Sequence, residues 1–318
     1  MKRIISNAPI LRDRGRSPHN HGSFADMMMI LLALLAVASA ARIEIEVAAE
    51  CASCVLFDKI CYNVTHLLDL QAPFRNKIVI HKIDLLRYEN RLFYSFEPTI
   101  DDEEYYKIGF VNLDDQNISG VINGVPKLVV NIGTFAIDQE NRRVYLGGDG
   151  GIVLLDAKTN IVVPYSSLGD DIRSLFYKHY VYFVRFDDRG VIVKKGDYFK
   201  TLLEYMPVKT FVVNKNDVIV FLNSYGLYVG KDAITHRLSI NAFFRGLTID
   251  LDGEVYTWWI DGIYRVVIDK NLYRSKIVKV AHLTSIGAMT FDNENNIIFT
   301  MDKSVYRLTE TKYNCTII

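Results

Sequence analysis

Basic side chains recur at one position of a repeated phrase in this chain, and their spacing suggests anion-binding chemistry. The equivalent positions, two residues before the first apolar residue of each repeat, are His81, Gly133, Arg173, Lys209, Arg245 and Gly287. Like charges brought together are costly unless something anionic lies between them. Arg173 and Arg245 can each contact a carboxylate in a bidentate manner. The column predicts a site for a carboxylate-bearing ligand, while the alternative is that these side chains cover strand ends and point to water.

The neighbouring positions supply smaller side chains and aromatic rings. The column one residue further on consists of Lys82, Thr134, Ser174, Thr210, Gly246 and Ala288. Phe243 and Phe244 directly precede Arg245, so one of their rings is expected to stack on a flat ligand beside the cations. The predicted ligand-binding residues are therefore His81, Arg173, Lys209, Arg245, Phe243 and Phe244.

Catalytic motifs are absent from the sequence. It has no Gly-x-Ser-x-Gly elbow, no His-Glu-x-x-His and no phosphate loop. Calcium requires several oxygen ligands, but the recurring column is basic or glycine. Asp138, Asp250 and Asp292 fall in predicted hairpin turns, where a carboxylate accepts backbone hydrogen bonds. We therefore expect no catalytic residue, no metal site and no cofactor.

A sixfold repeat must position these residues. The clearest copies begin at Phe135, Leu247 and Met289, and weaker copies begin at Ile83, Leu175 and Phe211. Each copy predicts a strand, a polar turn, a second strand and then a third. Repeats of strand and turn with a period near ~40 residues are typical of β-propellers. The prediction is an all-β six-bladed propeller, whose last sheet is completed by the segment before Ile83 or by the C-terminal strand.

Composition limits the class of partner. The chain has 318 residues, 37 Lys plus Arg and 37 Asp plus Glu, so its formal net charge is zero. A neutral chain is poorly suited to bulk electrostatic capture of nucleic acid or of acidic membranes. Half of its residues are hydrophobic, which is enough for one large globular domain. We expect a monomer that binds no nucleic acid.

The N-terminal region predicts export. Met27 to Ala40 is apolar, is short for a membrane span and ends in Ala-Ser-Ala, which is typical of a secretory signal cleaved before Ala41. The predicted division is an extension and signal over 1–40, a cysteine-containing segment over 41–75 and the propeller over 76–318. After cleavage no membrane anchor is expected, so the protein is predicted to be secreted and extracellular.

The cysteines and the acceptor sequons fit an exported chain. Exported chains with an even number of cysteines usually form disulfides, and the four here are Cys51, Cys54, Cys61 and Cys315. A ring brings its chain ends together, so Cys315 is expected to pair with one of the other three; the sequence does not choose among the three connectivities, and a zinc site is the alternative. The Asn-x-Ser/Thr patterns predict glycosylation at Asn63, Asn117 and Asn314.

The mature N-terminus resembles that of the lepidopteran ommochrome-binding proteins. The resemblance rests on Glu50-Cys-Ala-Ser-Cys-Val-Leu-Phe-Asp-Lys-Ile-Cys-Tyr, on the repeated phrase and on a lone C-terminal cysteine. It implies a secreted haemolymph or tissue protein that carries ommochromes, which are flat, tryptophan-derived pigments bearing carboxylates. A cationic and aromatic channel mouth suits such a ligand.

The predicted function is therefore a secreted, non-enzymatic carrier of a small aromatic acid of the ommochrome type. The first alternative is a metal-dependent lactonase or esterase of the gluconolactonase-like propeller type. The second is an extracellular propeller that binds other proteins through a flat face.

Overall fold

A computed structural model of the chain describes residues 54–71, 79–97, 106–122, 131–159 and 161–311. The predicted signal segment, Cys51, Asn314 and Cys315 lie outside these residues. Within them the regular elements are strands, apart from the one-turn 3-10 helices η1 (Arg87–Glu89) and η2 (Leu272–Arg274). None of the described helices is long and apolar enough to cross a membrane. The predicted all-β class is confirmed.

Four separate sheets each contain four antiparallel strands in chain order. The first consists of β3 (Val79–Leu86), β4 (Arg91–Glu97), β5 (Lys107–Asn112) and β6 (Ser119–Ile122). The second consists of β7 (Ile132–Asp138), β8 (Arg143–Gly148), β9 (Gly151–Asp156) and β10 (Ile161–Ser166). The third consists of β11 (Ile172–Lys178), β12 (Tyr180–Arg185), β13 (Val191–Lys195) and β14 (Tyr198–Leu202). The fourth consists of β15 (Thr210–Val213), β16 (Ile219–Asn223), β17 (Gly226–Lys231) and β18 (Ile234–Ser239).

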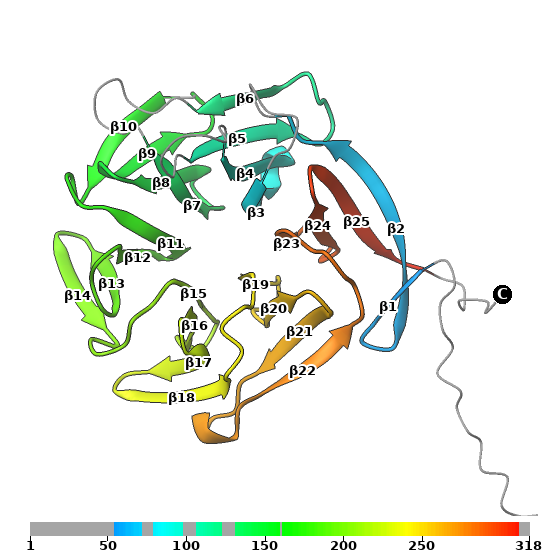
Figure 1. The fold of residues 1–318 in the computed structure, drawn as a ribbon. Coiled ribbons are helices and arrows are strands. Elements are labelled where there is room, and N and C mark those ends of the chain that lie inside the picture. The colour runs from blue at the N-terminus through cyan, green and yellow to red at the C-terminus, as the bar shows by residue number, and fades with distance from the viewer. Residues whose placement is uncertain (1–53, 72–78, 98–105, 123–130, 160, 312–318) are drawn as a thin grey trace, which may run out of the picture. The chain divides into compact units, whose positions relative to one another are not determined.

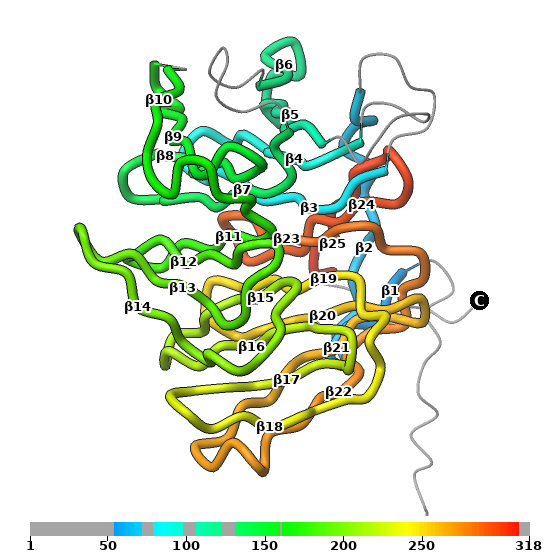
Figure 2. The backbone as a smooth tube through the Cα atoms, turned by 60° about the vertical axis from the view of Figure 1, so that its left-hand side comes forward, coloured from blue at the N-terminus to red at the C-terminus, as the bar shows by residue number. Residues whose placement is uncertain are grey.

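The remaining described strands form one nine-stranded sheet. Its first four are β19 (Gly246–Ile249), β20 (Val255–Trp259), β21 (Gly262–Val267) and β22 (Lys276–Ala281). They are followed by β1 (Val55–Phe57), β2 (Ile60–Asp69), β25 (Ser304–Glu310), β24 (Ile297–Met301) and β23 (Met289–Phe291). β2 pairs with β25 along most of its length, and Figures 1 and 2 show the two side by side. The expectation that a segment before Ile83 completes the last sheet is confirmed.

The first strand of each repeat lies innermost around a common axis (Figure 1). In the part of the chain described here, β3, β7, β11, β15, β19 and β23 each contact the next in this order, and β23 contacts β3. Each of these six strands contains the first apolar residue of a predicted repeat, and together they surround one axis, so the architecture is propeller-like.

The second strand of each repeat is buried on both faces because its sheet packs against a neighbour on either side. Phe93, Phe183, Phe221 and Phe299 lie in four of these strands and are fully buried. Burial of such a ring stabilises the fold by about 1.5–3 kcal/mol. The hydrophobic core therefore lies between the sheets and holds the ring together, which leaves the axis free for polar side chains.

The repeated aspartates organise the turn after the innermost strand. Asp138 Oδ1 accepts a hydrogen bond from the Asn141 amide at 3.1 Å. Asp250 Oδ1 accepts from the amides of Asp252 and Glu254 at 3.0 and 2.8 Å. The predicted structural role of these carboxylates is confirmed, and it explains why aspartate recurs there.

Candidate ligand-binding site

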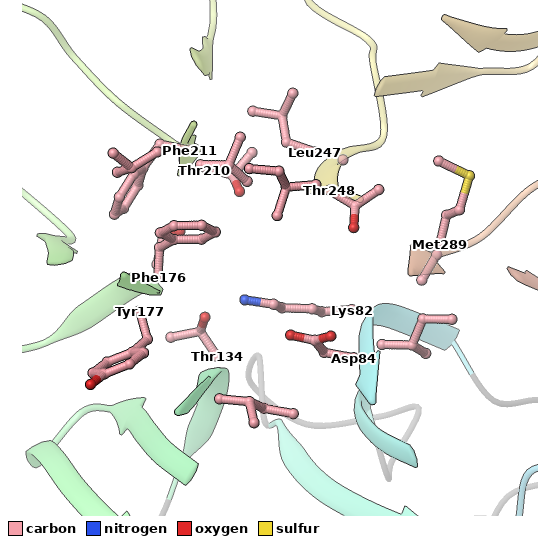
Figure 3. A pocket seen from close by; sticks show the side chains of 18 of the residues that line it. Lys82, Asp84, Thr134, Phe176, Tyr177, Thr210, Phe211, Leu247, Thr248 and Met289 are labelled. Atoms are coloured by element: carbon pink, nitrogen blue, oxygen red, sulfur yellow. The ribbon is translucent and has the colours of Figure 1, made fainter. Parts of the chain in front are cut away.

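A cavity of about 540 Å³ lies on the axis of the ring and is lined by residues from the innermost strands and the turns beside them. All six residues of the second column, which was not the predicted binding column, line the cavity: Lys82, Thr134, Ser174, Thr210, Gly246 and Ala288. Because side chains alternate along a strand, this confirms that the repeats were aligned in the correct register. Figure 3 shows Lys82, Thr134, Thr210 and Thr248 converging from different strands.

The predicted anion-binding column lines the cavity only in part. His81, Gly133, Arg173 and Arg245 belong to its lining, whereas Lys209 and Gly287 do not. Lys209 is exposed, and its backbone amide donates to Leu222 O at 2.8 Å. The structure therefore brings three of the four predicted basic side chains to one cavity.

Each of these three basic side chains already has a partner in the protein. His81 Nε2 lies 2.6 Å from Glu97 Oε1. The Arg173 guanidinium lies 4.8 Å from the centre of the Phe186 ring, and Arg245 Nη1 donates to Ile286 O at 2.9 Å. An arginine has five N–H donors, so both guanidinium groups can hold a ligand without breaking these contacts.

The predicted stacking residues are not at the cavity. Phe244 is 8% exposed and packs edge-on against Tyr264, so its ring is not open to a ligand. Phe243 is 70% exposed and lies against Trp259, and neither ring belongs to the cavity lining. The expectation for Phe244 is wrong because the chain turns before β19 and directs this side chain into the core. The rings that do line the cavity are Phe176, Tyr177, Phe211 and Trp258.

Lys82 is the basic group at the centre of the site. From β3 its Nζ donates to the carbonyl oxygens of Phe135 and Leu175 at 2.6 and 3.1 Å, and it lies 5.1 Å from the centre of the Phe135 ring. Burial lowers the pKa of Lys82 to about 8, although the nearby Asp84 carboxylate opposes the shift. The charge of this ammonium is therefore only partly compensated by the protein.

Asp84 lies two residues after Lys82 in β3 and lines the same cavity (Figure 3). Its Oδ1 accepts hydrogen bonds from the Leu85 amide at 2.8 Å and from the Thr290 hydroxyl at 2.9 Å. No hydrogen bond to Oδ2 occurs among the described residues. The carboxylate is thus held in place through one oxygen, while the other is left for a ligand or water.

Trp258 forms part of the cavity wall because Gly246 makes room for it. The two residues are cross-strand partners in β19 and β20. A Cβ atom on Gly246 would lie 2.5 Å from the Trp258 ring, closer than real Cβ contacts allow. The indole Nε1 donates to Gly287 O at 3.1 Å, which fixes the ring.

Lys82, Asp84 and Trp258 were missed as site residues by reasoning from the sequence. A signal for Lys82 was present, because it is the charged member of a column otherwise made of Thr, Ser, Gly and Ala. No such signal marks Trp258, which comes from a second strand. In the described residues, no group of three or more His, Cys, Asp or Glu side chains is placed to hold a metal ion.

Comparison with known proteins gives one relative in sequence and many in fold. No protein-family model matches the chain. An ommochrome-binding protein of Manduca sexta is 27% identical over 232 residues, which cover 69% of this chain and 80% of that protein.

Three solved structures illustrate the similarity in fold. A virginiamycin B lyase of Staphylococcus aureus crystallised with quinupristin has a TM-score of 0.56 at 11% identity, covering 79% of this chain and 100% of that one. A gluconolactonase of Xanthomonas campestris has a TM-score of 0.55 at 11% identity, covering 81% and 95%. The WD40 repeats of RRP9 have a TM-score of 0.53 at 8% identity, covering 79% and 100%. The predicted resemblance to ommochrome-binding proteins is confirmed, and the chain shares its fold with propeller proteins of several unrelated activities.

Proposed function

We propose that this protein binds a small aromatic pigment bearing a carboxylate, of the ommochrome class, in the axial cavity. The similarity to an ommochrome-binding protein supports the class of ligand. The observation that carries the proposal is the set of basic side chains that line one cavity, among them His81, Lys82, Arg173 and Arg245.

The size and the walls of the cavity suit such a ligand. Small-molecule sites usually have volumes of about 300–1,000 Å³ and combine apolar walls with a few polar groups, and this cavity has about 540 Å³. Phe176, which is half-buried, offers apolar surface to a flat ring system, while the basic groups orient its acidic end.

A metal-dependent lactonase is the second candidate, because a gluconolactonase shares the fold. The position of Lys82 disfavours it, since an ammonium inside the cavity repels a divalent cation. Metal analysis together with an assay of lactone hydrolysis separates the two: the proposal expects neither bound metal nor turnover.

We further infer that the ring has six blades and is closed by a disulfide to the C-terminus. The nine-stranded sheet is then counted as two blades bridged by the β1–β2 hairpin. Cys54 and Cys61 both take part in disulfides, and Cys61 O accepts from the amide of Thr311 at 3.0 Å, four residues before Cys315. Peptide mapping without reduction should find Cys315 bonded to one of the N-terminal cysteines, and a free Cys315 would contradict this closure.

We also infer that the protein is secreted as a monomeric glycoprotein. Asn63 and Asn117 are both exposed, as a glycan requires. Expression in insect cells should deliver protein to the medium with an N-terminus at Ala41 and glycans at these sites and at Asn314. Retention inside the cells without glycans would argue against secretion.

Titration by visible absorbance tests the binding function directly. The parent protein should bind xanthommatin, an acidic pigment of this class. Replacing Arg173 and Arg245 together by Met should weaken binding at least ~100-fold, because each charge-assisted contact contributes about 1.5–3 kcal/mol. The exposed Lys200→Met is the matched control and should bind as the parent does. If the parent protein does not bind the pigment, the proposed function is refuted. If the double variant binds as tightly as the parent, Arg173 and Arg245 are not the anion site.

A further inference from the structure

Lys82 and Asp84 place opposite charges side by side on the inner face of one strand. Residues two apart on a strand point to the same side and lie about 6.5–7 Å apart along it. Both residues line the cavity, yet the hydrogen bonds of Lys82 go to Phe135 and Leu175, and those of Asp84 go to Leu85 and Thr290. The two charges are therefore held by other groups and are not neutralised by direct contact with each other.

We propose that this pair is a subsite for the zwitterionic head of an α-amino acid carried by an aromatic body. Lys82 receives the carboxylate of the ligand and Asp84 receives its ammonium group. The inference deepens the proposed function, on which it rests, because it specifies which aromatic acids the cavity selects. A ligand with only a carboxylate satisfies Lys82 but leaves Asp84 without a cation.

The geometry of Lys82 supports the carboxylate half of this assignment. Two of the three ammonium donors are used on backbone carbonyls at 2.6 and 3.1 Å, so one remains for a ligand. Carbonyl oxygens carry only partial charge, and burial makes the uncompensated ammonium costly. A carboxylate oxygen supplies the missing full charge, and charge-assisted hydrogen bonds of this kind are about twice as strong as neutral ones.

The geometry of Asp84 supports the ammonium half. Its Oδ1 is fixed by the Leu85 amide and the Thr290 hydroxyl, which come from two different innermost strands. Held in this way, the carboxylate loses little conformational freedom when a ligand binds. Its second oxygen makes no hydrogen bond within the described ranges, so it can accept one from a ligand ammonium.

The surrounding wall fits the rest of such a ligand. Phe176 comes from β11 and Trp258 from β20, and both border the same cavity as the charged pair. Phe176 is half-buried and presents part of its ring, whereas Trp258 is 3% exposed and, fixed by its bond to Gly287, closes the wall. A flat aromatic body can therefore lie against Phe176 while its amino-acid head reaches β3.

Three related probes separate the two charges of the ligand. L-tryptophan has both, indole-3-propionic acid lacks the ammonium and tryptamine lacks the carboxylate. Calorimetric titration, and competition against bound xanthommatin, should show that tryptophan binds at least about tenfold more tightly than either analogue. If either analogue binds as tightly as tryptophan, or if tryptophan neither binds nor competes with bound pigment, the subsite is refuted.

Two variants assign each charge to its residue. Asp84→Asn should reduce the preference for tryptophan over indole-3-propionic acid to less than about threefold, and Lys82→Met should do the same for tryptophan over tryptamine. The exposed Asp197→Asn and Lys200→Met are matched controls and should keep both preferences. Unchanged preferences in folded Asp84→Asn or Lys82→Met protein would overturn the assignment.

The outcomes distinguish the subsite from the broader function. If xanthommatin binds but the three indoles are not discriminated, the subsite is wrong and pigment binding stands. If tryptophan is selected but xanthommatin does not bind, the subsite stands and the pigment function is wrong. The comparison of probes needs only the parent protein, so the inference can be refuted even if a variant fails to fold.

Discussion

Lys82 Nζ lies 2.6 Å from the carbonyl oxygen of Phe135, although 53 positions separate the two residues in the sequence. The same ammonium reaches Leu175 O, at a sequence separation of 93. It thereby joins β3 to β7 and β11, three neighbouring innermost strands. The position of this charge consequently depends on assembly of the ring. Changes in its protonation should therefore affect both ligand binding and stability.

Binding of a carboxylate should weaken as the pH rises. Lys82 is protonated below its pKa of about 8 and neutral above it, so only the form present at lower pH attracts an anion. Affinity for a carboxylate ligand should fall between about pH 7 and 9.5, by at most about tenfold per pH unit. Titrations across this range measure the slope, and calorimetry in two buffers of different ionisation enthalpy should detect proton uptake on binding near pH 8.5. A pH-independent affinity would show that Lys82 does not contact the ligand.

The same pKa predicts how the unliganded fold responds to pH. The unfolded lysine has a pKa of about 10.4, and the folded value is about 8. Between these values the unfolded state binds more protons, so the contribution of Lys82 to the free energy of unfolding should increase as pH rises from about 8 to about 10.

Chemical denaturation of the parent and of Lys82→Met isolates this contribution, because tyrosines and other groups affect both proteins alike. The difference in unfolding free energy, parent minus variant, should grow with pH in this window. A constant difference would mean that Lys82 has a similar pKa in the folded and unfolded chain.

Two glycines near the cavity should respond differently to an added methyl group. At Gly246 a Cβ atom would meet the Trp258 ring at 2.5 Å, whereas at Gly133 the nearest atom, on Tyr106, is 3.5 Å away. Gly246→Ala should therefore destabilise the fold by about 1–3 kcal/mol and weaken pigment binding, because the ring must move. Gly133→Ala should stay within about 0.5 kcal/mol of the parent. Denaturation curves of the two variants provide the comparison, and equal effects would contradict the described role of Trp258.

The strands and their register were predictable because their signals are local. Alternation along each strand and the aspartate after it recur in every clear repeat, so the six-residue column from Lys82 to Ala288 was correctly aligned. Side chains just outside the strands were harder to predict, because loop geometry directs them. Phe244 enters the core and Lys209 lies outside the cavity lining, whereas Arg245 lines the cavity, although all three lie just before an innermost strand.

Contacts between distant repeats could not be read from the sequence. The partners of Lys82 are backbone carbonyls, which any residue type supplies, so no sequence pattern marks them. The wall residue Trp258 likewise depends on a glycine across the sheet. The repeats thus predicted which positions are equivalent around the axis, whereas the choice of the column that lines the cavity and the chemistry of the site required the assembled ring.

The turn aspartates predict a stability effect that is separate from binding. Asp292 is 4% exposed, accepts from the amides of Glu294 and Asn296 at 2.9 Å each, and forms an ion pair with Arg307 Nε at 3.1 Å. Asp292→Ala removes the acceptor and leaves these donors without it, which should lower the free energy of unfolding by about 2–4 kcal/mol. Asp292→Asn keeps one acceptor oxygen for the backbone amides and should cost less than half as much.

Because Asp292 does not line the cavity, the folded fraction of both variants should bind pigment like the parent. Denaturation and pigment titration of the three proteins check this, and an alanine variant as stable as the parent would show that the repeated aspartate is not what holds the turn.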